Sequence, residues 1–199
     1  MKNVIFDFGN VIIRWDPYRA LSTVFNSREE MDKTLIEIGF FDWNLEQDRG
    51  RSWPEGIAIA KRDMPKHAHI FQAYADGLRP AHDELVAGTS ELIENLHNKG
   101  VGLFGLTNAS LATVDVVKSV APVLGLMQDI VVSAAESMIK PDAEIFELCL
   151  SRNNLERSQA LFVDDSLANC EAARTLGIAA HHFSDAAGLM AELLQRGLL

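Results

Sequence analysis

The feature of this sequence that most constrains its fold is a repeated alternation of short apolar runs with longer amphipathic runs. Amphipathic runs of helical period lie at 84–98, 110–119, 142–151, 166–176 and 184–194, and Ser184 is the expected N-cap of the last of these. Short apolar runs, typical of buried parallel strands, lie at 3–6, 101–106, 129–132, 160–163 and 178–182. This alternation predicts βαβ units and therefore an α/β fold with a doubly wound, mainly parallel, Rossmann-like sheet.

Residues 15–82 have a different character, because helix-like runs follow one another there without a convincing strand. The expected helices are 17–25, 28–38, 53–62 and 67–77, separated by Gly39, Gly50 and Pro65. We expect residues 15–82 to form a small helical cap domain inserted after the first strand. Residues 1–14 and 83–199 then form the α/β core domain.

Charge and hydropathy exclude several classes of partner. The 199 residues carry a formal net charge of −10, and no concentrated basic patch interrupts it, so neither nucleic acid nor an anionic membrane is an expected partner. No apolar run approaches the ~20 residues that a membrane span requires, and no signal peptide is recognised, so we expect a cytoplasmic protein. Cys149 and Cys170 are then expected to be free, buried thiols. The sequence leaves the oligomeric state open.

Polar and charged residues follow the predicted strands at the points where the strands end. In a parallel sheet these ends meet at one edge, where ligands bind. The residues that stand there, or at the start of the helix at 142–151, are Asp7, Thr107, Asn108, Lys140, Asp164 and Asp165.

The chemistry open to this group is narrow. Three neighbouring carboxylates repel one another, and Mg²⁺, which prefers oxygen ligands and is shared with substrate phosphates, relieves that repulsion. A carboxylate can also act as a covalent nucleophile toward phosphorus. Lys140 and Mg²⁺ together carry three positive charges against the three negative charges of Asp7, Asp164 and Asp165. The residues thus indicate phosphoryl transfer.

Four segments carry a family resemblance. Phe6–Val11, Leu106–Asn108, Lys140-Pro141 and Phe162–Asp165 resemble, in order, the four motifs of the haloacid dehalogenase-like hydrolase superfamily. The resemblance covers essentially the whole chain and is greatest to a branch that contains sugar-phosphate phosphatases, such as α-D-glucose-1-phosphate phosphatase, and the phosphatase domain of soluble epoxide hydrolase. It implies a magnesium-dependent phosphatase that hydrolyses a small phosphorylated metabolite, such as a sugar phosphate, through an aspartyl-phosphate intermediate.

The resemblance also implies roles for individual residues. Asp7 is the expected nucleophile and a magnesium ligand, and Thr107, Asn108 and Lys140 are expected to bind the transferring phosphoryl group. Asp165 is the expected direct ligand of the metal, and Asp164 is expected to reach it through water. The backbone carbonyl of Gly9 supplies a further ligand, and Asn169 supports the metal site.

Gly9 is also a departure from the family pattern. Most phosphatases of the superfamily have an aspartate at this position that protonates the leaving group. Such general acid catalysis typically raises the rate by ~10²–10⁴-fold. Its absence predicts a preference for anomeric sugar, acyl or aryl phosphates. The cap offers Glu46, Asp48 and Glu55 as substitute acids, although each is equally consistent with a solvated loop.

Some cap residues, and the reaction itself, allow more than one interpretation. The aromatic residues at 40–43 are typical of a cap core but also suit a substrate pocket, and Arg14 and Arg49 are candidates for a second anionic contact. A 2-haloacid dehalogenase would use the same aspartate without a metal and also lacks an acid at position 9, although the tandem Asp164-Asp165 argues against it. A catalytically idle binding module with this fold is the third possible function.

Overall fold

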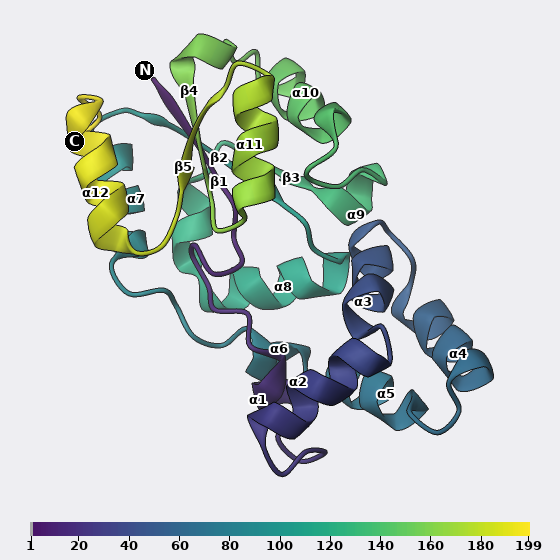
Figure 1. The fold of residues 1–199 in the computed structure, drawn as a ribbon. Helices are drawn as coiled ribbons and strands as arrows, with labels where there is room; N and C mark the ends of the chain where they lie inside the picture. The colour runs from purple at the N-terminus through teal and green to yellow at the C-terminus, as the bar shows by residue number, and fades with distance from the viewer. Residues whose placement is uncertain (1) are drawn as a thin grey trace.

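The structure, a computed structural model, describes residues 2–199 and has a sheet-containing lobe and a helical lobe (Figure 1). The described residues form a five-stranded sheet in the order β3-β2-β1-β4-β5, in which each neighbouring pair is parallel. Its strands are β1 (Asn3–Phe6), β2 (Gly102–Thr107), β3 (Asp129–Val132), β4 (Ala160–Asp164) and β5 (Ala179–His182). The predicted parallel α/β architecture is therefore confirmed.

Helices cover both faces of the sheet, because successive side chains of each strand point to opposite faces. On one face, Val4 and Phe6 belong to an apolar cluster with residues of α7 (Thr89–Asn98) and α12 (Ala186–Gln195). On the other, Ile5 packs with residues of α10 (Ala143–Arg152) and α11 (Leu167–Thr175). Figure 1 shows these two pairs of helices on opposite sides of the strands. β1 is thus buried on both faces.

The helical lobe consists of residues 17–81 and lies between β1 and β2 in the chain. Its helices are α1 (Pro17–Leu21), α2 (Arg28–Glu37), α3 (Phe40–Asp48), α4 (Trp53–Asp63), α5 (Ala68–Asp76) and α6 (Leu78–Ala81). They pack around an apolar cluster of their own, in which the rings of Phe40 and Tyr74 meet edge to face with centroids 4.9 Å apart. As expected, no residue between 15 and 82 belongs to the sheet.

Helix α3 was not predicted, because the polar stretch at 45–51 was interpreted as a solvated loop. The helical signal was nevertheless present, since Phe40, Trp43 and Gln47 are buried at helical spacing while Phe41 is exposed. Of the two interpretations of the aromatic residues at 40–43, a cap core and a substrate pocket, each therefore applies to some of these residues. Phe40 and Trp43 are core, and Phe41 is free to face a pocket.

Two helix starts differ by two or more residues from the sequence prediction. Helix α7 begins at Thr89 and not at residue 84, because Ile12 and Arg14 hydrogen-bond with the backbone of Val86 and Glu84 and hold that segment extended. Helix α12 begins at Ala186, and its N-cap is Asp185, whose carboxylate accepts the Gly188 N–H at 2.8 Å. The prediction of Ser184 as the cap was wrong by one residue.

Shorter elements complete the sheet lobe. They are η1 (Pro122–Leu126), α9 (Ser133–Glu136) and η2 (Arg157–Gln159). The remaining helix of this lobe, α8 (Leu111–Val120), is longer and runs toward the helical lobe (Figure 1). Cys149 and Cys170 are buried and unpaired, as expected. None of the helices within residues 2–199 combines the length and the apolar character that crossing a bilayer requires.

Candidate active site

The candidate active site lies at the carboxyl edge of the three central strands. Asp7 directly follows β1, Thr107 ends β2 and Asp164 ends β4. Because β1 pairs with both β2 and β4, the ends of these strands are neighbours, and the Asp7 N–H donates to Val163 O at 2.9 Å. The topology alone therefore brings together residues that are far apart in the chain.

Lys140 joins these strand ends through its ammonium group. Its Nζ lies 2.9 Å from Asp7 Oδ1 and 2.7 Å from Asp164 Oδ2, and it donates to Leu106 O at 2.8 Å. These three acceptors match the three protons of the ammonium group. Burial opposes the charge of Lys140, but the carboxylates of Asp7 and Asp164 outweigh it, so the pKa of Lys140 is raised. Lys140 is therefore a buried cation.

Asn108 holds the backbone of Lys140 in place. Its Nδ2 donates to Lys140 O and its Oδ1 accepts from Lys140 N, both at 2.9 Å. The side-chain amide is therefore engaged with the lysine backbone, and the donors that Asn108 has left for a phosphoryl group are the second N–H of Nδ2 and its backbone N–H. Thr107, the residue before Asn108, is buried and lines a cavity that lies between the two lobes.

The two tandem aspartates have different surroundings. Asp164 is fully buried and accepts hydrogen bonds from Lys140 Nζ, from the Ser166 N–H at 2.8 Å and from Asn169 Nδ2 at 3.1 Å. Asp165 faces the cavity and accepts one side-chain hydrogen bond, from Asn10 Nδ2 at 3.1 Å. Asp165 is thus the more available of the two for an external ligand.

Asp7, Asp164 and Asp165 each offer a carboxylate oxygen within 4.8 Å of the others. Burial raises the pKa of Asp7 and of Asp165, and the charge of Asp164 raises both further, while Lys140 lowers them. Against three carboxylates, Lys140 supplies one positive charge. A set made only of oxygen donors with two uncompensated negative charges fits a hard divalent cation such as Mg²⁺.

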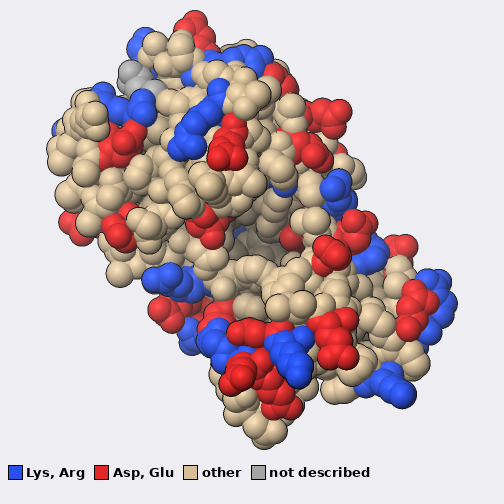
Figure 2. Space-filling view, in the orientation of Figure 1, with Lys and Arg blue, Asp and Glu red and all other residues tan. Residues whose placement is uncertain are grey.

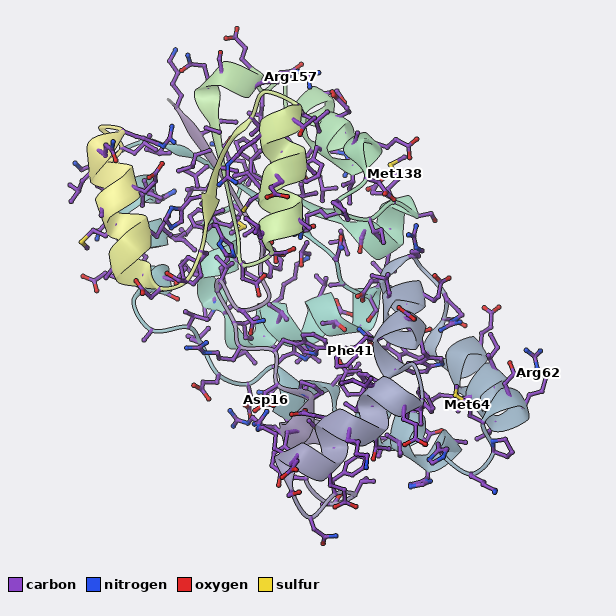
Figure 3. All side chains as sticks on the ribbon, viewed as in Figure 1. Asp16, Phe41, Arg62, Met64, Met138 and Arg157 are labelled. Atoms are coloured by element: carbon purple, nitrogen blue, oxygen red, sulfur yellow. The ribbon has the colours of Figure 1, made fainter. Side chains whose placement is uncertain are left out.

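A cavity of about 420 Å³ opens beside these residues, between the two lobes, and Figure 2 shows it as a hollow with acidic side chains on its rim. Its catalytic end is formed by Asp7, Gly9, Thr107, Asn108 and Asp165. Its remaining walls are mostly apolar and come from both lobes, and they include Phe8, Ile13, Trp15, Phe41, Leu45, Tyr74, Val114 and Val117. Figure 3 shows Phe41 at the place where the helical lobe faces α8.

Sequence reasoning missed several cavity residues. Trp15, whose Nε1 donates to Tyr74 Oη at 2.9 Å, and His82 are members of no motif. Among the predicted cap acids, only Asp48 lines this cavity, while Glu46 and Glu55 are exposed outside it. The two arginine candidates do not line it either: Arg14 lies at a neighbouring hollow, and Arg49 pairs with Glu46 and Asp142.

Comparisons with known proteins show similarity to phosphatases and to HAD family enzymes. The chain is 28% identical to the sesquiterpene phosphatase astK of Aspergillus oryzae, over 98% of this chain and 95% of that protein. It is also 28% identical to the drimenol cyclase drtB of Aspergillus calidoustus, over 89% of this chain but 33% of that longer protein. A HAD family enzyme from Bacteroides thetaiotaomicron, solved with magnesium and inorganic phosphate, has the same fold, with a TM-score of 0.73, 22% identity, and 93% and 95% of the two chains covered.

The similarity to one known protein family extends over nearly the whole chain. Residues 4–182 match the family described as haloacid dehalogenase-like hydrolase, a range that begins within β1 and ends with β5. It therefore contains the strand ends that carry Asp7, Thr107 and Asp164, together with the segment inserted between the first two strands. The chain belongs to the haloacid dehalogenase-like hydrolase family of enzymes.

Proposed function

We propose that this protein is a magnesium-dependent phosphatase in which Asp7 attacks the phosphorus of a monoester and forms an aspartyl phosphate. The observation that carries the proposal is the position of Lys140 Nζ between Asp7 and Asp164, at 2.9 and 2.7 Å, beside a third carboxylate. This arrangement holds the Asp7 carboxylate in a fixed orientation at the end of a rigid strand. A pre-oriented carboxylate is what in-line attack on phosphorus requires.

The metal would be held by Asp7, the backbone carbonyl of Gly9 and Asp165, with Asp164 acting through water. The saturated hydrogen bonding of Asp164 and the open side of Asp165 support this division. Asn169 supports the site by orienting Asp164. When bound, Mg²⁺ supplies positive charge to the phosphoryl oxygens and lowers the pKa of the surrounding carboxylates.

The transferring phosphoryl group would be bound by the Thr107 hydroxyl, an N–H group of Asn108 and Lys140. For Lys140 to contact it directly, one of the three present acceptors must give way, and Leu106 O is the neutral one. A phosphoryl oxygen is the stronger acceptor because it carries charge. Residues 15–82, which close over this end of the sheet, would then serve as the cap.

The alcohol part of the substrate is proposed to be apolar. The cavity walls beyond the catalytic end are formed largely by aromatic and aliphatic side chains, and no lysine or arginine lines the cavity in the described part of the chain. A sugar phosphate would place many of its hydroxyl groups against these apolar side chains, and a polar group that loses its water without a new hydrogen bond is costly to bury. The sesquiterpene phosphatase among the relatives is named for a substrate class with a hydrocarbon skeleton. The apolar walls therefore favour a terpenoid or similar apolar phosphomonoester over a sugar phosphate.

A dehalogenase function fits the site less well. A dehalogenase attacks carbon in a carboxylate substrate and needs no metal, so the two negative charges left over after pairing with Lys140 would repel that substrate. An idle binding module is disfavoured by the ion pairs that hold Asp7, since such a module has no need of an oriented nucleophile.

The test is phosphate release by the purified protein from farnesyl phosphate and from glucose 1-phosphate, with and without Mg²⁺. We expect magnesium-dependent release that favours the farnesyl ester, and Asp7→Asn should lower the rate by several orders of magnitude. Rapid quenching followed by mass analysis should find the phosphoryl group on the peptide that contains Asp7. Metal-independent halide release from 2-chloropropionate, or full activity in Asp7→Asn, would contradict the proposal.

A further inference from the structure

The proposed reaction needs a proton for the departing alcohol, and position 9 cannot supply it. Gly9 has no side chain, although a Cβ placed there would meet no atom within 4 Å. The absence of an acid at this position is therefore not forced by crowding. An apolar alcohol is a poor leaving group unless its oxygen is protonated as the bond to phosphorus breaks. The proton must come from another group that lines the cavity.

The remaining titratable groups of the cavity can be compared one by one. His82 is buried, which lowers its pKa and favours the neutral ring, and its Nδ1 contacts Leu78 O at 2.8 Å. Since a carbonyl can only accept, the single ring proton is on Nδ1, and Nε2 has none to donate. Tyr74 is also buried, which raises its pKa and makes its hydroxyl a weak acid. Asp42 is exposed to water in the first turn of α3.

Asp48 is the remaining candidate, and the protein holds it firmly against the sheet lobe. It is the last residue of α3, and the turn that follows it touches the core at two points. A Cβ on Gly50 would lie 2.9 Å from Ala134 O in α9, and Arg49 lies 3.8 Å from Asp142 at the start of α10. The position of Asp48 relative to Asp7 is therefore set by backbone packing as well as by its own helix.

From this geometry we infer that Asp48 is the general acid and base of the reaction, donating a proton to the leaving alcohol from the helical lobe. The inference rests on the proposed phosphatase function. Asp48 belongs to the lobe opposite Asp7, so the substrate phosphate would lie between nucleophile and acid. That placement is the one that in-line transfer needs, because the leaving oxygen points away from the nucleophile.

The two half-reactions balance with Asp48 as the only proton carrier. An oxygen of Asp7 bonds to phosphorus while the bond from phosphorus to the ester oxygen breaks, and the Asp48 proton moves to that oxygen. The alcohol leaves neutral, and Asp48 is left as a carboxylate. A water molecule then attacks the aspartyl phosphate and gives a proton to Asp48 as the bond from phosphorus to Asp7 breaks. Inorganic phosphate is released, and Asp48 is protonated again.

The environment of Asp48 suits both protonation states. Burial, together with the negative charge of Asp7, raises the pKa of Asp48 to about 7, and a hydrogen bond from the Ser110 backbone opposes this. Ser110 is the N-cap of α8, and a helix N-terminus stabilises a carboxylate. A substrate dianion would favour the protonated form further. Asp48 can thus hold a proton before the first step and bear a charge after it.

The experiment compares esters whose leaving groups differ in basicity, using octyl phosphate and p-nitrophenyl phosphate with saturating Mg²⁺. For Asp48→Asn we expect kcat/KM to fall by ~10²–10⁴-fold for the octyl ester and by less than about tenfold for the nitrophenyl ester, which needs no proton. Glu46→Gln is the matched control, since Glu46 is an exposed carboxylate of the same helix outside the cavity. It should retain both activities.

The outcomes separate this inference from the proposed function. Equal losses on both esters, or no loss on either, would overturn the role of Asp48 while leaving the phosphatase intact. If the wild-type protein with Mg²⁺ hydrolyses neither ester, the proposed function itself fails. If Asp48→Asn does not fold, the wild-type protein still provides a test through a wider series of esters. A shallow dependence of kcat/KM on leaving-group pKa is expected, and a steep one would overturn the inference.

Discussion

The three protons of the Lys140 ammonium group go to Asp7, Asp164 and Leu106 O, all within 2.9 Å. Breaking such a buried pair by removing one partner typically costs ~3–5 kcal/mol, because the other charge is left uncompensated. Lys140 therefore stabilises the fold and the nucleophile together. Asp48 differs, since it is partly buried and no lysine or arginine within residues 2–199 compensates its charge.

This difference predicts a pH-dependent effect of Asp48→Asn on the stability of the metal-free protein. The pKa of Asp48 rises from 3.8 to about 7 on folding, so the folded state binds this proton more tightly. The contribution of Asp48 to wild-type stability therefore falls as pH rises through this interval. Asparagine does not titrate. The free energy of unfolding of the variant, relative to that of wild type, should therefore be ~1–3 kcal/mol greater at about pH 8 than at about pH 4.

Urea denaturation at both pH values measures this difference. The groups that face Asp48 are Asp7, Tyr74 and the Ser110 amide, and they are the same in both proteins. Glu46→Gln, which changes an exposed carboxylate, should show no comparable trend. A variant whose relative stability is the same at both pH values would show that burial does not perturb Asp48.

Helix α3 connects the cavity wall to the core of the sheet lobe. Phe40 and Trp43 bury one face of it in the helical lobe, while Phe41, Leu45 and Asp48 line the cavity. Its C-terminal end leads into Gly50, which has a φ of +108° and lies close to Ala134 O. Only glycine adopts this conformation without strain and allows this close approach.

We therefore expect Gly50→Ala to disturb the docking of α3. The added methyl group would meet a backbone oxygen at 2.9 Å, and the backbone strain adds to that clash, so the variant should lose ~1–3 kcal/mol of stability. If it also displaces Asp48, octyl phosphate hydrolysis should fall more than nitrophenyl phosphate hydrolysis. Gly125→Ala is the control, because a Cβ there would meet nothing within 4 Å. Equal thermal stability of the two variants would contradict the expectation.

At the scale of the whole molecule, the cavity exists only between the two lobes, and its catalytic end carries more negative than positive charge. A ligand that binds this end in the folded state alone must stabilise the fold. Mg²⁺ at a hundredfold excess over its Kd should add ~2.7 kcal/mol and raise Tm accordingly.

Thermal denaturation with and without Mg²⁺ tests this linkage. Asp165→Asn should remove most of the Tm shift, because Asp165 is the open carboxylate of the cluster. Glu46→Gln, which removes an exposed carboxylate of α3 outside the cavity, should keep the shift. Equal shifts in all three proteins would place the metal elsewhere.

Much of the fold was predictable from the sequence, because the signals involved are local. The apolar runs of β1 and β3 coincide with the observed strands Asn3–Phe6 and Asp129–Val132, since a doubly buried strand needs uninterrupted apolar residues. Helix α3 and the start of α7 were not predicted correctly. The start of α7 is decided by contacts with a distant segment, as the bonds of Ile12 and Arg14 to residues 86 and 84 show. For α3 the helical spacing of Phe40, Trp43 and Gln47 was present in the sequence, but polar residues on its other face obscured it.

The sequence by itself determined the parallel α/β fold, the helical insertion and the identity of the polar residues at the strand ends. These follow from periodicity and from the rule that parallel strands end at one edge. Only the tertiary structure decided that Lys140 is saturated by three acceptors, that Asn108 braces its backbone, and that Asp48 lines the cavity while Glu46 and Glu55 do not. The physical reason is that helical phase and lobe packing place each side chain, and neither can be read from residues whose contact partners lie far away in the chain.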